Sequence, residues 1–284
     1  MEDTFFCLER KDKLNDLKSA LKKAQEDVRA RCPMAPSITN FVTVDFVANA
    51  QIAVGGSAAM VYMPDEGSAM AEIAQCLYIN VGTLIPVHAQ TVPNAAKAAH
   101  EKCAYVLDPV AAGMGELRTK LLTEMKNYPP SIVRANASEV ITLARMWGLI
   151  DTDEGKVRGV DSTESVESAR EAAEILARFI KGAVCVSGED DLITDGDRTL
   201  LSFGGSDYFA RITGSGCSLG GVCAIYRSVT DPFTAAVAAT NAYNVAGAIA
   251  EKKAEGTASF KVAFLDALSN ISGDDLAACP MKEI

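Results

Sequence analysis

The sequence predicts an α/β fold with a mostly parallel central sheet and helices on both faces. From residue 76 onward, short apolar runs recur, and each ends in a polar or glycine-rich turn followed by a helical stretch. Repeated strand–turn–helix units form parallel strands joined by right-handed crossovers. The composition agrees, because 49% of residues are apolar but only 6% are aromatic, which suits close packing of helices on a parallel sheet.

The chain is predicted to form a single domain over residues 1–284, with an N-terminal helical segment at 1–33. A length of 284 residues is within reach of one α/β domain, and no linker, repeat or low-complexity tract divides it. The segment 11–31 is expected to be a helix ended by Pro33 and Pro36. Its apolar face is formed by Leu14, Leu17, Leu21 and Val28.

Charge and cysteine content exclude several classes of protein. There are 37 acidic and 27 basic residues, which gives a net charge of -10 with no basic block, so nucleic acid is not an expected partner. None of the eight cysteines forms a CxxC pair, and we expect reduced, mostly buried thiols. The acidic start and the lack of a membrane-spanning apolar run predict a cytoplasmic protein without a membrane partner.

Polar residues follow the predicted strands. The parallel strands are expected at 77–79, 105–107, 132–133 and 184–186, and a hairpin or pair of edge strands at 192–194 and 200–203. Six polar residues come just after the parallel strands, namely Asn80, Asp108, Arg134, Asn136, Glu139 and Ser187. Ligands of open α/β sheets bind outside the carboxyl ends of the strands, so these residues predict one edge of a site.

The sharpest local signal is the glycine-rich turn at 212–217, which precedes a predicted helix at 218–228. Gly214 and Gly216 remove side chains where a phosphate would approach the backbone, and the helix N-terminus presents free N–H groups to an anion. The spacing fits neither a Walker A loop nor a Rossmann fingerprint. A tight turn without a ligand remains the alternative interpretation.

Two carboxylates are candidates for organising Mg²⁺, which keeps several waters and takes few protein ligands. Asp108 ends a strand, where it either orders water around the metal or caps a turn. Glu139 follows Asn136 by three residues, and this spacing also fits a helix capping box. His88 and His100 are the only histidines in the sequence and lend little support to a zinc site or a Ser-His-Asp triad.

The final third is predicted to be mostly helical. Asp231 and Pro232 have the residue types of an N-cap and a first helical position. An alanine-rich helix is therefore expected over 235–254.

Taken in order, the motifs resemble the hydroxyethylthiazole kinase family of thiamine salvage, within the ribokinase-like superfamily. The resemblance covers about residues 38–268. The motifs that carry it are Ile38–Asn40, Gly55–Met60, Ile79–Leu84, Leu107–Val110, Arg134–Glu139, Arg158–Ser162 and Thr213–Cys217.

The resemblance implies a ribokinase-like fold, an ATP- and Mg²⁺-dependent kinase and specific residue roles. Gly214, Gly216 and their neighbours would form an anion hole, with Cys217 where most ribokinase-like enzymes place a catalytic Asp. The family is typically trimeric, and each thiazole pocket is shared between two subunits. The resemblance also implies that the thiazole contacts Asn40, Val42, Met60 and Gly214. ATP would contact Arg134, Asn136 and Ser187, and Mg²⁺ would be organised by Asp108 and Glu139.

Several positions depart from the family pattern. Ala135 replaces a usual Gly, and Ser187 and Ser215 replace usual Thr residues. Pro36-Ser37 stands where a His often precedes the Ile-Thr-Asn motif, and the 256–260 stretch differs from Gly-Pro-Gly-Ser-Phe. The changes at 37 and at 257–258 bear on substrate preference.

The main hypothesis is phosphorylation of the primary alcohol of 4-methyl-5-(2-hydroxyethyl)thiazole. Three alternatives remain: a kinase for a pyrimidine or pyridoxal, a dehydratase of hydrated nicotinamide nucleotides, and a non-catalytic precursor-binding protein. Such dehydratases share the glycine-rich turn but keep Asp where Cys217 stands here. The joint presence of Asp108, Arg134 and Glu139 argues against a pure binding protein.

Overall fold

The computed structural model describes residues 2–151 and 169–284, with side chains from residue 13 onward. The 158–162 motif therefore lies outside the described residues. Within the described part, nine strands form one sheet in the order β2-β1-β3-β4-β5-β6-β7-β8-β9. Strands β1 to β6 pair in parallel, and β7, β8 and β9 extend the sheet with antiparallel pairs. The mostly parallel α/β fold predicted from the sequence is confirmed.

Each strand has three to five residues. Their bounds are β1 (Met34–Ile38), β2 (Ser57–Met60), β3 (Leu77–Asn80), β4 (Tyr105–Asp108), β5 (Ile132–Asn136), β6 (Ala183–Ser187), β7 (Asp191–Thr194), β8 (Thr199–Ser202) and β9 (Met281–Glu283).

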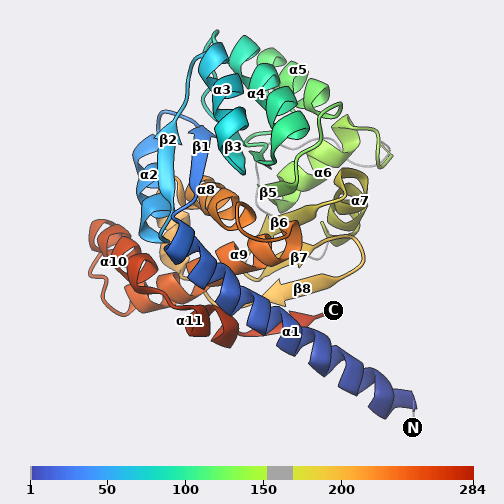
Figure 1. Cartoon of the computed structure of the whole chain (residues 1–284), viewed down its shortest axis with the longest axis vertical. Coiled ribbons are helices and arrows are strands. Elements are labelled where there is room, and N and C mark those ends of the chain that lie inside the picture. The colour runs from blue at the N-terminus through green and yellow to red at the C-terminus, as the bar shows by residue number, and fades with distance from the viewer. Residues whose placement is uncertain (1, 152–168) are drawn as a thin grey trace.

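Helices connect the parallel strands and cover both faces of the sheet (Figure 1). Their bounds are α1 (Glu2–Arg31), α2 (Val44–Ala53), α3 (Pro64–Ile73), α4 (His88–Lys102), α5 (Glu116–Met125), α6 (Ala137–Met146), α7 (Arg170–Ile180), α8 (Ser215–Arg227), α9 (Pro232–Glu251), α10 (Thr257–Asn270) and α11 (Gly273–Ala278), with a 3-10 turn at Asp207–Arg211. Helix α1 packs on α9 and α11, and its N-terminal end extends away from the body (Figure 1). No described helix is long and apolar enough to cross a membrane.

Alternating residues of the strands belong to two separate hydrophobic clusters, because successive side chains of a strand point to opposite faces of the sheet. Tyr78 and Val106 belong to the cluster under α8 and α9, whereas Ile79 and Leu107 belong to the cluster under α4 to α7. The seven cysteines whose side chains are described are all free, and four of them are buried. The expectation of reduced, mostly buried thiols is therefore met in this part of the chain.

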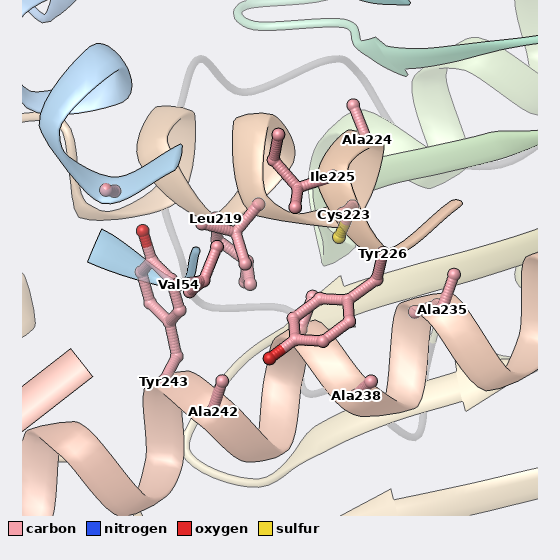
Figure 2. Close-up of a cluster of buried hydrophobic side chains, with 14 of the residues drawn as sticks. Val54, Leu219, Cys223, Ala224, Ile225, Tyr226, Ala235, Ala238, Ala242 and Tyr243 are labelled. Carbon is pink, nitrogen blue, oxygen red and sulfur yellow. The ribbon is translucent and has the colours of Figure 1, made fainter. Parts of the chain in front are cut away.

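Small residues let α8 lie close to both α9 and the sheet. Figure 2 shows Cys223 and Tyr226 of α8 facing the alanine surface of α9, which includes Ala238. On the sheet side, a Cβ added at Gly220 would lie 2.5 Å from Cε2 of Tyr78. This close packing fixes the height of the α8 N-terminus above the strand ends.

The structure corrects several boundaries. Strands β1 and β2 were not predicted, and Pro36, which was expected to help end the first helix, lies inside β1. A proline is tolerated there because β1 pairs with β3 only from Ser37 onward. Arg134 was expected after a strand but lies inside β5. The helix predicted at 218–228 begins at Ser215, which places Cys217 in its first turn.

Candidate active site

The glycine-rich turn forms an open helix N-terminus, as the sequence suggested. Gly214 caps α8 with φ 90°, in the left-handed region that favours glycine. A Cβ at this position would also lie 2.6 Å from Cγ2 of Thr43. The first helical bond runs from Ser218 N–H to the Gly214 carbonyl, so the N–H groups of residues 215–217 have no partner within the helix. A helix N-terminus with free N–H groups of this kind can bind an anion.

Arg134 brings a fixed positive charge to this turn. A Cβ at Gly216 would lie only 2.4 Å from Nη1 of Arg134, so glycine is needed for the guanidinium to lie against α8. Its Nη2 donates to Ser187 Oγ at 2.8 Å, and its Nη1 lies 3.4 Å from Oδ2 of Asp108. The usual Thr is replaced by Ser187, which keeps the hydroxyl that contacts Arg134.

Asp108 is fully buried beside Arg134. Its Oδ2 accepts from Tyr78 Oη at 3.0 Å and from Arg134, whereas its Oδ1 is buried without a hydrogen-bond partner among the described residues. Burial raises the pKa of the Asp108 carboxyl to about 6, and the Arg134 charge opposes that rise. Burial also disfavours the charged guanidinium, but the Asp108 and Glu139 carboxylates hold the pKa of Arg134 above its usual value. The guanidinium therefore stays charged.

Cys217 lies next to Asn40 at the start of α8. The Asn40 side chain is buried, and its Nδ2 is 3.3 Å from Sγ of Cys217. Burial raises the pKa of the Cys217 thiol, and the Asp108 charge adds to that rise while Arg134 opposes it. The ground state at neutral pH is accordingly a thiol and not a thiolate.

Glu139 and Asn136 form the capping box that their spacing indicated. Asn136 Oδ1 accepts from Glu139 N–H at 2.9 Å, and Glu139 Oε2 accepts from Asn136 N–H at 3.0 Å. Glu139 Oε1 also accepts from Ala111 N–H at 2.9 Å, which ties the loop after β4 to α6. Ala111 has φ 56°, uncommon for a residue with a side chain, so this bond holds a strained turn.

Among the described residues no group of three or more His, Cys, Asp or Glu side chains could enclose a metal ion. Asp108 and Glu139 are nevertheless the kind of sparse donor set that Mg²⁺ accepts when it keeps its waters. The buried, unpartnered Oδ1 of Asp108 supplies a free acceptor for such a water. Each oxygen of Glu139 keeps acceptor capacity beyond its one backbone bond.

The four expected thiazole contacts lie in different surroundings, and one of them, Gly214, caps α8. Asn40 is buried beside Cys217, but Val42 is 67% exposed and Met60 is half-buried at the end of β2. Next to Val42, the exposed ring of Phe41 stacks on Tyr62, with 5.2 Å between ring centroids.

Sequence reasoning missed Tyr78 and Thr43. Tyr78 looked like an ordinary apolar strand residue, although it alternates with Asn80 and so shares its face of β3. Thr43 follows Asn40 in a turn, and only the fold brings it against Gly214. Of the two histidines, His88 Nδ1 accepts from Ile85 N–H, and His100 Nδ1 lies 3.2 Å from the Pro129 carbonyl oxygen.

Comparison with known proteins gives a consistent result. Residues 25–274 match the model of the hydroxyethylthiazole kinase family. The chain is 50% identical to hydroxyethylthiazole kinase of Bifidobacterium adolescentis, covering 96% of this chain and 97% of that protein. It is 38% identical to the enzyme of Brachyspira hyodysenteriae, covering 93% and 98%.

Solved structures agree with this match. The hydroxyethylthiazole kinase protein of Pyrococcus horikoshii superposes with a TM-score of 0.82 at 28% identity, over 93% of this chain and 98% of that one. A pyridoxal kinase of Staphylococcus aureus in complex with ADP has a TM-score of 0.57 at 15% identity, over 88% and 99% of the two chains, and shows the shared fold alone.

Proposed function

The chain belongs to the hydroxyethylthiazole kinase family, and we propose that it transfers the γ-phosphoryl group of ATP to the primary alcohol of 4-methyl-5-(2-hydroxyethyl)thiazole in thiamine salvage. The observation that carries this is the meeting of three groups at one sheet edge. The open N-terminus of α8, the buried Arg134–Asp108 pair and the Asn40–Cys217 contact converge there. Phosphoryl transfer needs this kind of positioning and charge stabilisation more than covalent chemistry.

Each group has a role in the reaction. The alcohol oxygen forms a bond to the γ-phosphorus while the bond to the β,γ-bridging oxygen breaks, ADP leaves, and the hydroxyl proton is released late to water. The N–H groups following Gly214 and Gly216 bind the transferring phosphoryl oxygens. Arg134 and Ser187 contact the ATP phosphates, and Asn136 lies at the same strand ends. Asn40, Val42 and Met60 contact the thiazole.

Asp108 and Glu139 would hold the water shell of Mg²⁺. When bound with ATP, this ion neutralises charge on the phosphate oxygens. Asp108 contributes its free Oδ1, while Arg134 keeps Oδ2 occupied. Glu139 contributes from the start of α6, where its backbone bonds fix its side chain.

One experiment separates this function from its alternatives. The protein is incubated with ATP, Mg²⁺ and either the thiazole alcohol, the hydroxymethylpyrimidine, pyridoxal or a hydrated nicotinamide nucleotide, and products are identified by mass. We expect thiazole phosphate and ADP in equal amounts. Faster phosphorylation of the pyrimidine or of pyridoxal would indicate a kinase for that substrate. Dehydration of the nucleotide would indicate a dehydratase, and no turnover would indicate a precursor-binding protein.

Cys217 is expected to be dispensable as a base. Cys217→Ala should keep measurable turnover, losing about tenfold to a hundredfold, because a buried thiol is a poor base and the loose transition state releases the hydroxyl proton late. Cys217→Asp should keep or increase turnover, because a carboxylate there can accept from Asn40 Nδ2 and is more readily ionised than the thiol.

Turnover and melting temperature of both Cys217 variants decide between a chemical and a packing role. An Asp variant that is inactive and unstable, beside an Ala variant with wild-type turnover, would show that Cys217 only packs the start of α8. Burying a carboxylate without a partner would then destabilise the fold.

The assembly is proposed to be a homotrimer whose thiazole pockets lie between subunits. Supporting this, Val42, one of the expected thiazole contacts, is exposed, as are its neighbour Phe41 and Met63. Light scattering should give three times the mass of 30.0 kDa per chain. A fully active monomer would contradict the proposal.

A further inference from the structure

Tyr78 links the two halves of the site through buried hydrogen bonds. It projects from β3 toward α8, and its side chain is fully buried. Its hydroxyl accepts a hydrogen bond from Asn80 Nδ2 at 2.9 Å and lies 3.0 Å from Oδ2 of Asp108. Asn80 Oδ1 in turn lies 3.2 Å from Asn40 Nδ2, which also contacts Cys217. A continuous chain of contacts thus runs from Cys217 to Asp108.

Two backbone amides fix the direction of every bond in this chain. Thr43 N–H donates a hydrogen bond to Asn40 Oδ1 at 3.1 Å, and Gly82 N–H donates one to Asn80 Oδ1 at 2.9 Å. A backbone N–H can only donate, so the oxygen of each amide must face it, and each NH₂ must face the other way. Asn80 therefore donates to Tyr78, and the single proton of the Tyr78 hydroxyl is left for Asp108.

The phenol is well placed to remain a donor. Burial, together with the Asp108 charge, keeps the pKa of Tyr78 well above its usual range. Its ring is held from the other side by α8, since Gly220 leaves space for it against the helix backbone. Tyr78 thus contacts the helix whose N-terminus forms the anion hole and the carboxylate that faces it.

We propose that Tyr78 is a positioning residue that holds Asp108 with Oδ2 occupied and Oδ1 free for the water shell of Mg·ATP. The proposal rests on the proposed function. With Tyr78 and Arg134 both donating to Oδ2, the carboxylate has one fixed orientation, and Oδ1 is the oxygen that has no hydrogen-bond partner in the described part of the chain. Without the hydroxyl, the carboxylate can rotate and Asn80 Nδ2 loses its acceptor.

The test compares Tyr78→Phe with Tyr105→Phe. Both tyrosines are fully buried on neighbouring strands, but the Tyr105 hydroxyl donates to the Tyr128 carbonyl at 2.5 Å, on the other face of the sheet. Binding of a non-hydrolysable ATP analogue with Mg²⁺ is measured by calorimetry, alongside kcat, KM for the alcohol and melting temperature. A hydrogen bond to a charged group is worth about tenfold or more in an equilibrium.

We expect Tyr78→Phe to weaken Mg-analogue binding and to lower kcat, each by about tenfold, with KM for the alcohol within about threefold of wild type. Tyr105→Phe should lower the melting temperature and leave binding and kcat unchanged. Wild-type binding and kcat in Tyr78→Phe, with a fall in melting temperature like that of Tyr105→Phe, would overturn the proposal.

A second comparison tests whether Tyr78 acts through Asp108. In an Asp108→Asn background, adding Tyr78→Phe should change Mg-analogue binding by less than twofold, because the carboxylate to be positioned is gone. A further tenfold loss in that background would show that Tyr78 acts by another route. Calorimetry does not depend on the acceptor alcohol, so a wrong thiazole assignment would leave these results unaffected.

Discussion

Replacing Arg134 with alanine is expected to lower kcat/KM by at least about a thousandfold. An arginine that stabilises a transferring phosphoryl group contributes about 10³–10⁵ in rate. Here Ser187 and Asp108 hold the guanidinium against the first turn of α8, at 2.8 and 3.4 Å, and the glycine at 216 makes room for it. Affinity for ATP should fall more than affinity for the thiazole alcohol, because the guanidinium pairs with phosphate oxygens.

The same change should destabilise the fold through Asp108. That carboxylate is fully buried, and losing its ion-pair partner costs about 3–5 kcal/mol in comparable buried pairs. A double variant, Arg134→Ala with Asp108→Asn, removes the orphaned charge and should recover most of the free energy of unfolding. Turnover should stay lost, since neither charged group is restored.

Urea unfolding and single-substrate titrations measure these effects. Arg227→Ala is the control, because Arg227 lies at the opposite end of α8 and its Nη1 donates to the Thr230 carbonyl. It should leave kcat and ATP affinity at wild-type values. Equal losses of ATP and thiazole affinity in Arg134→Ala would instead assign Arg134 a structural role.

Replacing Gly214 with valine is expected to lower turnover by about a hundredfold or more while the fold survives. Removing one donor from a comparable oxyanion hole costs about 10²–10³ in kcat. A Cβ at Gly214 would lie 2.6 Å from Cγ2 and 2.9 Å from Cβ of Thr43, and φ 90° strains any branched side chain. The turn must therefore shift and carry the N–H groups of 215–217 with it.

Gly148→Val is the matched control for that variant. Gly148 also has positive φ, at 64°, but a Cβ there meets nothing within 4 Å. It should lower the melting temperature through backbone strain without changing kcat. If Gly214→Val kept near-normal turnover, the turn would not belong to the active site.

Much of the fold could be predicted from local pattern. Strands β3, β4 and β6 were recognisable because parallel strands buried on both faces read as short apolar runs. The hairpin of β7 and β8 was recognisable from the turn at 195–196. Strands β1 and β2 were missed because Pro36 looked like a helix stop, and because three of the four residues of β2 are small and all four are only half-buried.

Some features of the candidate site could likewise be predicted from local sequence, and others could not. The sequence by itself determined the open turn at Gly214, the Asn136–Glu139 cap and the polar residues at strand ends, because these depend on backbone conformation and on spacing of a few residues. Tertiary structure alone decided that Arg134 lies against Gly216, that Thr43 faces Gly214, and that Tyr78 donates to Asp108. These contacts join residues from different strands and helices, and their distances are set by how closely α8 packs on the sheet.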